Sequence, residues 1–484
     1  MVATSYRASR GPALGRGEAL VLLGVLGVLV AVNLPELGSD PWPFRPPPAE
    51  PRGPLAPLVR ASGGEWEPGL LRAAAALAGL LVALVAGFAL SLGGLRRWIG
   101  VATAAVVVAL LVVPGVALQV GLREATAPWF HDNDSTYQIE IAGELVRGGD
   151  SPYGHDYSRS GLERFYSLDG SVSPETRAGQ VALRHFAYFP GTPLTAAAWG
   201  ALPAPLDDYR ILVALTSLAA LPAALLFRGP LGVRLALGAA LAASPLAVRA
   251  AWFGTADAPA VLAVVLAFGL LERRRHVGAA IVLALAVLLK QFAVVAVPFL
   301  AAALTWRARR RSQARAGVAF AAVLAVGFTP FLIADAGALV ADTIAYGGET
   351  YRIIGYGLAG MLLETGAIDD RFGPYPFAVL TLLVWLPLTA WLVRMQLRSP
   401  AEWTAAAGFA ASILVLLFIG RVFQTSYLVW PLAASLLAGL LALSEAYRSS
   451  AEEMIAPGAG NATTGGSETG SAAHSHPDAL RGRP

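Results

Sequence analysis

The chain has 484 residues, of which 56% are hydrophobic and only 14% are charged, and its formal net charge at pH 7 is +4. This composition excludes an ordinary soluble protein and is typical of a polytopic helical membrane protein. There is no cysteine, so disulfides and thiol chemistry are excluded as well. The arginines fall between apolar segments rather than in one basic patch, so we expect no nucleic acid among the partners.

The N-terminal part, residues 1–98, contains two predicted transmembrane helices, at 18–34 and 69–92, joined by the proline-rich segment PWPFRPPPAEPRGP. Arginines precede the first helix and follow the second, and the positive-inside rule places both groups in the cytoplasm. A third predicted helix, 99–121, then leaves the cytoplasm. Residues 122–208 are therefore predicted to form a loop outside the cytoplasm.

Two arginine-rich clusters, 272–276 and 307–315, are both expected in the cytoplasm. The segment between them is almost wholly apolar, and a single straight span would leave one cluster outside. We therefore predict a hairpin of two short helices with Lys290 at its external tip.

The other apolar segments complete a predicted bundle of about twelve transmembrane helices with both termini cytoplasmic. The fold class is thus all-α and polytopic, with short amphipathic helices in the external loop. Residues 99–447 form the membrane domain, 335–373 a second external loop, and 448–484 a disordered cytoplasmic tail. Segment 192–206 is too short to cross and is predicted to be a half-helix on the external side. The remaining spans are predicted at 209–227, 231–250, 254–271, 316–334, 374–395, 403–419 and 425–446.

An acidic segment, HDNDSTYQIEIAGELVRGGDSPYG, follows the third predicted helix. Asp134 precedes an amphipathic pattern that ends at Gly148 and Gly149, so it is a candidate N-cap of a short helix. Capping does not explain the neighbouring Asp132. The alternative is a carboxylate that accepts a proton from a hydroxyl group, or that binds a metal ion together with its neighbour.

Lys290 is the only lysine among the 36 basic residues. One interpretation is a side chain that snorkels to the membrane interface. The other is a compact ammonium that binds a phosphate on a membrane-anchored substrate. Ionisable groups near the membrane tend to be functional, and several others are predicted on the same external side. These further candidate substrate-binding residues are Arg249, Asp257, Tyr137, Tyr188, His185, Arg352, Arg421 and Gln424.

Taken together, these motifs resemble the GT-C superfamily of integral-membrane glycosyltransferases, most nearly the bacterial family 87, an alpha-mannosyltransferase-like group. The resemblance spans about residues 100 to 445. It rests on Asp134 with Tyr137 and the Gly-Gly and Pro-Tyr pairs that follow, on AYFPGTPL, on Lys290 with Gln291, and on RVFQTSYLVWP before the last predicted span.

The resemblance implies a GT-C-like bundle in the cell membrane with its active site outside the cytoplasm. Such an enzyme passes a sugar, here mannose or another hexose or pentose, from a polyprenyl-phosphate carrier to a lipid or glycan acceptor with inversion. Asp134 would be the general base, with Asp132 as helper, and Lys290 with one or two arginines would bind the phosphate.

Two alternatives stay open from the sequence. A divalent cation is possible at the Asp-x-Asp pair, whereas no zinc, P-loop or dinucleotide motif predicts another cofactor. A transporter or flippase of lipid-linked sugars is the alternative function, although transporters usually hold polar sites near the midplane between repeats.

Overall fold

The computed structural model describes residues 13–38, 57, 68–126, 133–166 and 181–455. Apart from one pair of two-residue strands, the regular elements among these residues are helices. The N-terminal half contains α1 (Arg16–Gly38), α3 (Pro68–Gly93), α4 (Arg97–Thr126), α5 (Asp134–Gly148), η1 (Tyr157–Arg159), η2 (Leu162–Tyr166), α7 (Gly191–Trp199), α8 (Tyr209–Ala223), η3 (Ala224–Leu226), α9 (Leu231–Ala243) and α10 (Pro245–Phe253).

The C-terminal half continues in the same manner, with helices broken by short 3₁₀ or π segments. Its elements are α11 (Asp257–Glu272), α12 (His276–Leu289), η4 (Gln291–Ala296), α13 (Val297–Arg307), α14 (Arg310–Val340), η5 (Ala341–Thr350), β1 (Ile354–Gly355), α15 (Leu358–Glu364), α16 (Phe377–Leu380), η6 (Thr381–Trp385), α17 (Leu386–Arg398), α18 (Glu402–Phe418), β2 (Val422–Phe423), η7 (Thr425–Leu428) and α19 (Val429–Ile455).

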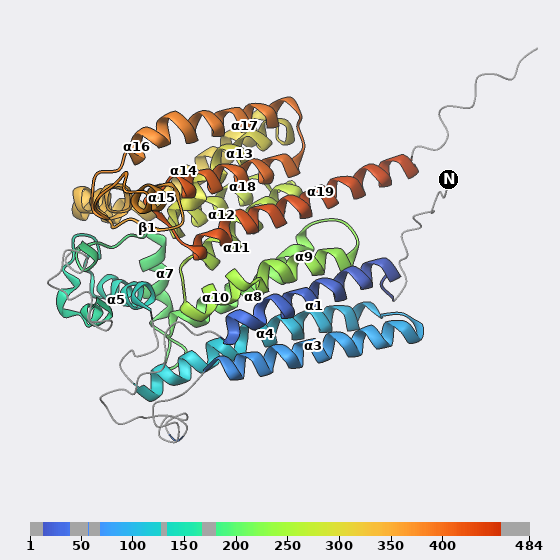
Figure 1. Ribbon diagram of the computed structural model, residues 1–484. Coiled ribbons are helices and arrows are strands. Elements are labelled where there is room, and N and C mark those ends of the chain that lie inside the picture. Colours follow the sequence, from blue (N-terminus) through green and yellow to red (C-terminus); the bar gives the residue numbers. More distant parts are fainter. Residues whose placement is uncertain (1–12, 39–56, 58–67, 127–132, 167–180, 456–484) are drawn as a thin grey trace, which may run out of the picture.

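The long helices lie side by side in a bundle (Figure 1). Helices α1, α3 and α4 form one flank, α13, α14 and α17 lie on the opposite flank, and α8, α9, α11 and α19 lie between them. The small elements α5, α7, α15 and β1 gather at one end, which we call the loop end. Helix α1 begins and α19 ends at the other end of the bundle.

That other end is called the arginine end, because Arg228, Arg307 and Arg448 meet there around two buried carboxylates. Arg448 lies 3.1 Å from Glu272 and 3.3 Å from Glu402, and Arg307 forms ion pairs with the same two residues. Arg228 contacts Glu272 at 3.5 Å. Charges on four helices and one connection are thereby tied together, so this end is held by ion pairs to two carboxylates that are shielded from water.

The predicted hairpin around Lys290 is confirmed. Helix α12 ends just before this residue, and the chain returns through η4 and α13. At the base of the hairpin, His276 Nδ1 lies 3.1 Å from Ser312 Oγ, and Arg307 lies 3.4 Å from Glu272. Both arginine-rich clusters therefore lie at the same end of the bundle, while Lys290 lies at the loop end.

The two ends are separated by roughly the thickness of a membrane. Near the start of α19, the indole nitrogen of Trp430 donates a 2.8 Å hydrogen bond to Asp257, and further along the same helix Arg448 contacts Glu272. At 1.5 Å of rise per residue, this stretch of α19 is about 27 Å long. The hydrocarbon core of a bilayer is about 30 Å thick.

The predicted count of about twelve transmembrane helices is not confirmed. Within the described residues, seven helices are long and apolar enough to cross a membrane, or eight if the bent pair α9–α10 forms one span. The other four predicted spans correspond in the structure to helical segments of 17 residues or fewer, namely α11, α12, Gln291–Arg307 and α18. Hydropathy located these segments, but their lengths are set by the tight turns between them.

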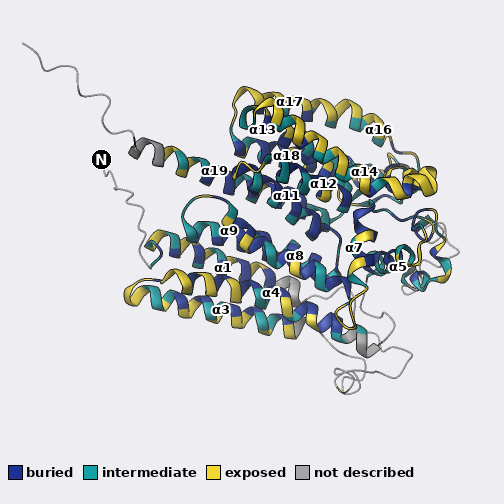
Figure 2. Cartoon of the chain, turned by 180° about the vertical axis from the view of Figure 1, so that it is seen from behind, coloured by how far each residue is buried: buried dark blue, intermediate teal, exposed yellow. Residues whose placement is uncertain are grey.

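Exposure follows the position in the bundle (Figure 2). Side chains of α8, α11 and α18 are mostly buried, whereas large apolar side chains on α3, α14 and α17 are exposed. Exposed apolar faces on outer helices are expected where lipid replaces water as the solvent. The protein is accordingly a multi-pass membrane protein in its helix lengths, composition and surface.

Two short helices of the loop end match the sequence analysis. The amphipathic helix after the acidic segment is α5, and it ends as predicted at a left-handed Gly149 with φ 88°. The segment predicted as a half-helix contains α7, whose 9 residues are too few to cross a membrane. At the C-terminus, α19 continues to Ile455, beyond the predicted start of the tail, and residues 456–484 lie outside the described part of the chain.

Candidate active site at the loop end

The start of α5 is fixed by Asn133 and not by the candidate N-cap Asp134. The Asn133 side chain accepts a hydrogen bond from the backbone N–H of Thr136 and donates one of 2.7 Å to the carbonyl of Phe253. The Thr136 hydroxyl donates to the same carbonyl. Asn133 is the N-cap because its amide both caps the helix and donates to the end of α10, and a carboxylate cannot do both. Asp134 is thus the first residue of the helix and is partly exposed.

Tyr188 connects Asp134 with Lys290. Burial raises the pKa of Tyr188 well above its usual 10.0, a hydrogen bond with Ser135 opposes this shift, and the charges of Tyr427, Asp257 and Asp134 raise the pKa further. The hydroxyl therefore lies beside the first turn of α5. The Lys290 ammonium lies 4.5 Å from the centre of the same ring. The Tyr188 hydroxyl thus contacts Ser135, the neighbour of the candidate base Asp134. The ring of the same tyrosine contacts the Lys290 ammonium.

Lys290 itself is buried in a cage of aromatic rings and one carboxylate. Its side chain is only 7% exposed, and its ammonium lies 3.6 Å from Oδ1 of Asp257. The ring of Phe292 lies 5.5 Å from the ammonium, and Trp430 donates to the Asp257 oxygen. Cation–π contacts and the carboxylate together offset the cost of burying this charge.

The segment AYFPGT holds the tip of the hairpin in place. Gln291 donates a 3.0 Å hydrogen bond to the carbonyl of Ala187, and the Thr192 hydroxyl donates one of 2.5 Å to the carbonyl of Leu289. Between them Gly191 lies so close that a Cβ atom there would be 2.6 Å from the Leu288 carbonyl carbon. A side chain at Gly191 would therefore push the segment away from Lys290.

A second loop, residues 351–373, reaches the site through Tyr351. Burial raises the pKa of its Tyr351, and the nearby charge of Asp134 raises this pKa further, against a hydrogen bond from Arg352. The loop is anchored by Arg421, which is 2% exposed and donates to the carbonyls of Tyr351, Arg371 and Gly373 at 2.8, 3.3 and 3.1 Å. Arg421 is therefore occupied in holding the loop.

The loop is also joined to the rest of the chain by two parallel strands. In β1 and β2, Ile354 pairs with Val422 and Gly355 with Phe423. Gly355 has φ 95°, a left-handed conformation that favours glycine, and a Cβ atom there would collide with the Phe423 carbonyl. The close approach of the two strands therefore depends on this glycine.

The same part of the molecule matches a known family. Residues 186–420 match the model of glycosyltransferase family 87. This match supports a family 87 glycosyltransferase-like protein. Neither a curated protein nor a solved structure matches it significantly. Of the residues around Tyr188, the matched segment includes Asp257 and Lys290 but not Asp134.

The other predicted site residues of the family 87-like protein lie around this centre. The Tyr137 hydroxyl donates to the Ser160 carbonyl at 3.0 Å, so it holds the segment that follows α5. Arg249 and Arg352 are partly buried, the former 5.6 Å from the Phe253 ring centre. Gln424 precedes η7, which carries Tyr427. His185 lies 2.8 Å from Asp342.

The Asp-x-Asp pair, the possible metal site of the family 87-like protein, lies only partly within the described residues. Asp132, the predicted partner of Asp134, lies outside the described residues. Among the residues that the structure does describe, no group of three or more His, Asp or Glu side chains is arranged to hold a metal ion.

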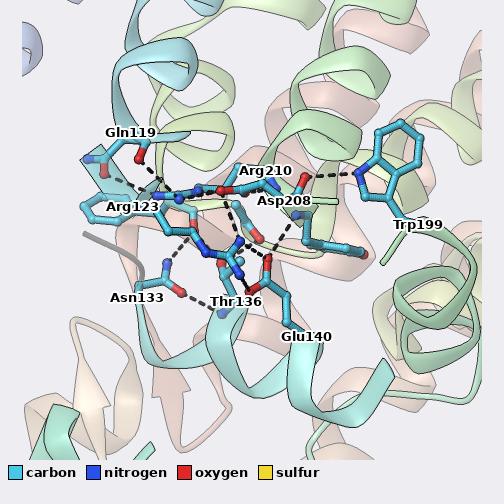
Figure 3. A network of polar contacts seen from close by, with 11 residues as sticks. Gln119, Arg123, Asn133, Thr136, Glu140, Trp199, Asp208 and Arg210 are labelled. Atoms are coloured by element: carbon cyan, nitrogen blue, oxygen red, sulfur yellow. Dashed lines mark hydrogen bonds and ion pairs between the residues drawn. The ribbon is translucent and has the colours of Figure 1, made fainter. Parts of the chain in front are cut away.

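The sequence analysis missed a buried charge network behind α5 (Figure 3). Arg123 of α4 contacts Glu140 of α5 at 2.8 Å and Asp208 at 3.2 Å. Arg210 donates two hydrogen bonds to Asp208, at 2.9 and 2.6 Å, and one to Gln119 at 3.2 Å. The only sequence signal was the pair of aspartates before an apolar helix, which is typical of an N-cap. The network fixes α5, and hence Asp134, on α4 and α8.

Proposed function

We propose that the protein is a membrane glycosyltransferase that moves a sugar from a polyprenyl-phosphate carrier to an acceptor hydroxyl outside the cytoplasm, with inversion. Mannose, or another hexose or pentose, is the proposed sugar, and a lipid or glycan is the proposed acceptor. The family 87 match supports glycosyl transfer. The position of Asp134 next to Tyr188, which also contacts Lys290, is the single observation that carries the mechanism.

In the proposed reaction Asp134 is the general base. Its carboxylate accepts the proton of the acceptor hydroxyl while that oxygen attacks the anomeric carbon from the face opposite the phosphate. The bond between the anomeric carbon and the phosphate oxygen breaks, and the electron pair leaves with the polyprenyl phosphate. Because the leaving group is already a stable anion, no protein acid is required. Asp132 is proposed as the helper of the base.

The leaving phosphate needs positive charge at the membrane surface. Lys290 is the proposed source, and Asp257 at 3.6 Å holds its ammonium in place but also offsets its charge. Further cations are therefore required, and we propose the partly buried Arg249 and Arg352 for this role. Arg421 acts in this proposal through the loop that it anchors.

The proposed external location of the site is supported by the distribution of arginine. Arg228, Arg307 and Arg448 lie at one end of the bundle and Asp134 and Lys290 at the other. Cytoplasmic ends of transmembrane helices are enriched in arginine and lysine. By this rule the arginine end, where α1 begins and α19 ends (Figure 1), is cytoplasmic and the loop end is extracytoplasmic.

Replacing Asp134 by asparagine tests the proposal. We expect Asp134→Asn to lower transfer from radiolabelled polyprenyl-phosphate mannose at least about 100-fold, because the amide cannot accept the proton. Glu144→Gln is the matched control, since Glu144 is exposed on the same helix, and it should retain full activity. Full activity of Asp134→Asn would place the base elsewhere. Movement of the intact lipid-linked sugar across vesicles without any glycosylated product would favour the transporter instead.

A further inference from the structure

A histidine–aspartate pair lies beside the candidate active site. His185 Nδ1 is 2.8 Å from Oδ1 of Asp342, whose side chain is 2% exposed. The other carboxylate oxygen of Asp342 accepts a 2.9 Å hydrogen bond from the backbone N–H of Gly154. Both oxygens of this buried carboxylate are therefore engaged, and it needs the Nδ1–H of the imidazole as a donor.

The imidazole is held on its other sides as well. Its ring stacks on Tyr346 with the ring centres 4.7 Å apart, and Gln138 of α5 donates to the His185 carbonyl at 2.8 Å. The His185 side chain is nevertheless 23% exposed. With Nδ1 occupied and the ring plane fixed, Nε2 is the atom that this residue presents outward. Among the described residues, no hydrogen bond to Nε2 is formed.

The histidine–aspartate pair lies near residues of the proposed reaction. The Tyr346 ring that stacks on His185 lies 5.0 Å from the ring of Tyr351, and Tyr351 is close enough to Asp134 to respond to its charge. On the other side, Gln138 of α5 donates to the His185 carbonyl, and Ser135 at the start of the same helix forms a hydrogen bond with Tyr188. His185 is thus linked to the surroundings of Asp134 through the rings of Tyr346 and Tyr351.

We propose that His185 binds a sugar hydroxyl through Nε2, and that Asp342 is the positioning residue that fixes the required tautomer. This inference rests on the proposed glycosyl transfer. Neutral imidazole with its proton on Nδ1 has a lone pair on Nε2, which accepts a hydrogen bond from a hydroxyl group. The charge of Asp342 offsets that of a protonated imidazole, so the pair offers little attraction for a phosphate. A neutral ligand rich in hydroxyl groups fits the pair best.

The inference is tested with sugars that lack single hydroxyl groups. The donors are polyprenyl-phosphate mannose and its monodeoxy forms, and the acceptors are octyl α-mannoside and its monodeoxy forms. For the wild-type protein we expect one of these deoxy compounds to have a kcat/KM lower by roughly 10-fold or more than its parent. In His185→Ala the same compound and its parent should be used equally well, since the partner of that hydroxyl is gone. Whether the compound is a donor or an acceptor identifies the sugar that His185 binds.

Asp342→Asn separates positioning from folding. It keeps the size of the side chain but removes the charge. We expect it to reduce the loss of kcat/KM for that one deoxy compound, while the losses for the other deoxy compounds stay unchanged. His276→Ala, at the arginine end, is the control for loss of an imidazole and should keep every loss of kcat/KM that the wild type shows. If the wild-type protein transfers sugar and each deoxy compound loses the same kcat/KM in His185→Ala as in the wild type, the inference is overturned but the proposed function is not. Absence of wild-type transfer with every donor and acceptor would overturn the proposed function, and the inference with it.

Discussion

The ammonium of Lys290 and the carboxylate of Asp257 lie 3.6 Å apart, and each side chain is less than 10% exposed. The pair joins the tip of the Lys290 hairpin to the first turn of α11. Trp430 of α19 completes it with a hydrogen bond to the same carboxylate oxygen. Three segments of the chain therefore meet at one buried ion pair, and each charge depends on the other.

Removing one charge of this pair is expected to destabilise the fold more than removing both. Lys290→Met leaves the Asp257 carboxylate buried without its cation, and we expect a loss of about 3–5 kcal/mol in the free energy of unfolding. In the double variant Lys290→Met/Asp257→Asn, the amide still accepts from Trp430, and most of that loss should be recovered. Thermal unfolding in detergent, followed by tryptophan fluorescence, measures both. Equal losses in the single and double variants would show that the pair contributes no coupling.

The network around Asp208 predicts a dependence of stability on acidic pH. Burial alone would raise the pKa of Asp208, but Arg210 and Arg123 outweigh it and lower this pKa from 3.8 to about 2. A carboxyl whose pKa falls on folding stabilises the fold above its unfolded value and loses that contribution as pH falls toward the folded value. We expect a contribution of about 2 kcal/mol at neutral pH that disappears between pH 4 and pH 2.

Asp208→Asn removes this component, so its unfolding temperature should lie below that of the wild-type protein at pH 7 and approach it near pH 2. The neighbouring Asp207 provides the matched control, since it is only partly buried and has no ion pair among the described contacts. Asp207→Asn should follow the wild-type pH profile. A parallel profile for wild type and Asp208→Asn would exclude the proposed contribution of Asp208.

The sidedness of the two ends is directly testable because the chain has no cysteine. Ala367 in the 351–373 loop and Ser450 near the end of α19 are both exposed. We expect Ala367→Cys to react with a membrane-impermeant maleimide on intact cells, and Ser450→Cys to react only after permeabilisation. The cysteine-free parent is the control for background labelling. The reverse pattern would place the loop end in the cytoplasm and remove the basis for an extracytoplasmic reaction.

Periodicity and charge were sufficient to predict several elements from the sequence. The amphipathic pattern after Asp134 and the glycines that end it predicted α5, because both are local properties. The two arginine clusters predicted the Lys290 hairpin, since a rule of charge distribution limits the possible folds of the segment between them. The short α7 followed from its limited apolar length.

Contacts between distant segments were beyond the sequence. Asn133 caps α5 in place of Asp134 because its amide also reaches Phe253, and nothing near the helix start indicates that contact. The pairing of Lys290 with Asp257 depends on how two turns meet in space. Asp342 lies in an apolar stretch and gave no signal until His185 was seen next to it. The predicted number of spans was not confirmed for a related reason, since hydropathy does not fix where a helix stops.

The anchoring of residues 351–373 by Arg421 has a dynamic consequence. One guanidinium holds three carbonyls of this loop, and the strand beside Arg421 pairs with β1 within the same loop. Moving the base of the loop outward breaks several of these hydrogen bonds together, so partial opening there gains little freedom. Amide hydrogens on both sides of the strand pair should therefore exchange with solvent at a common rate, as a single cooperative unit.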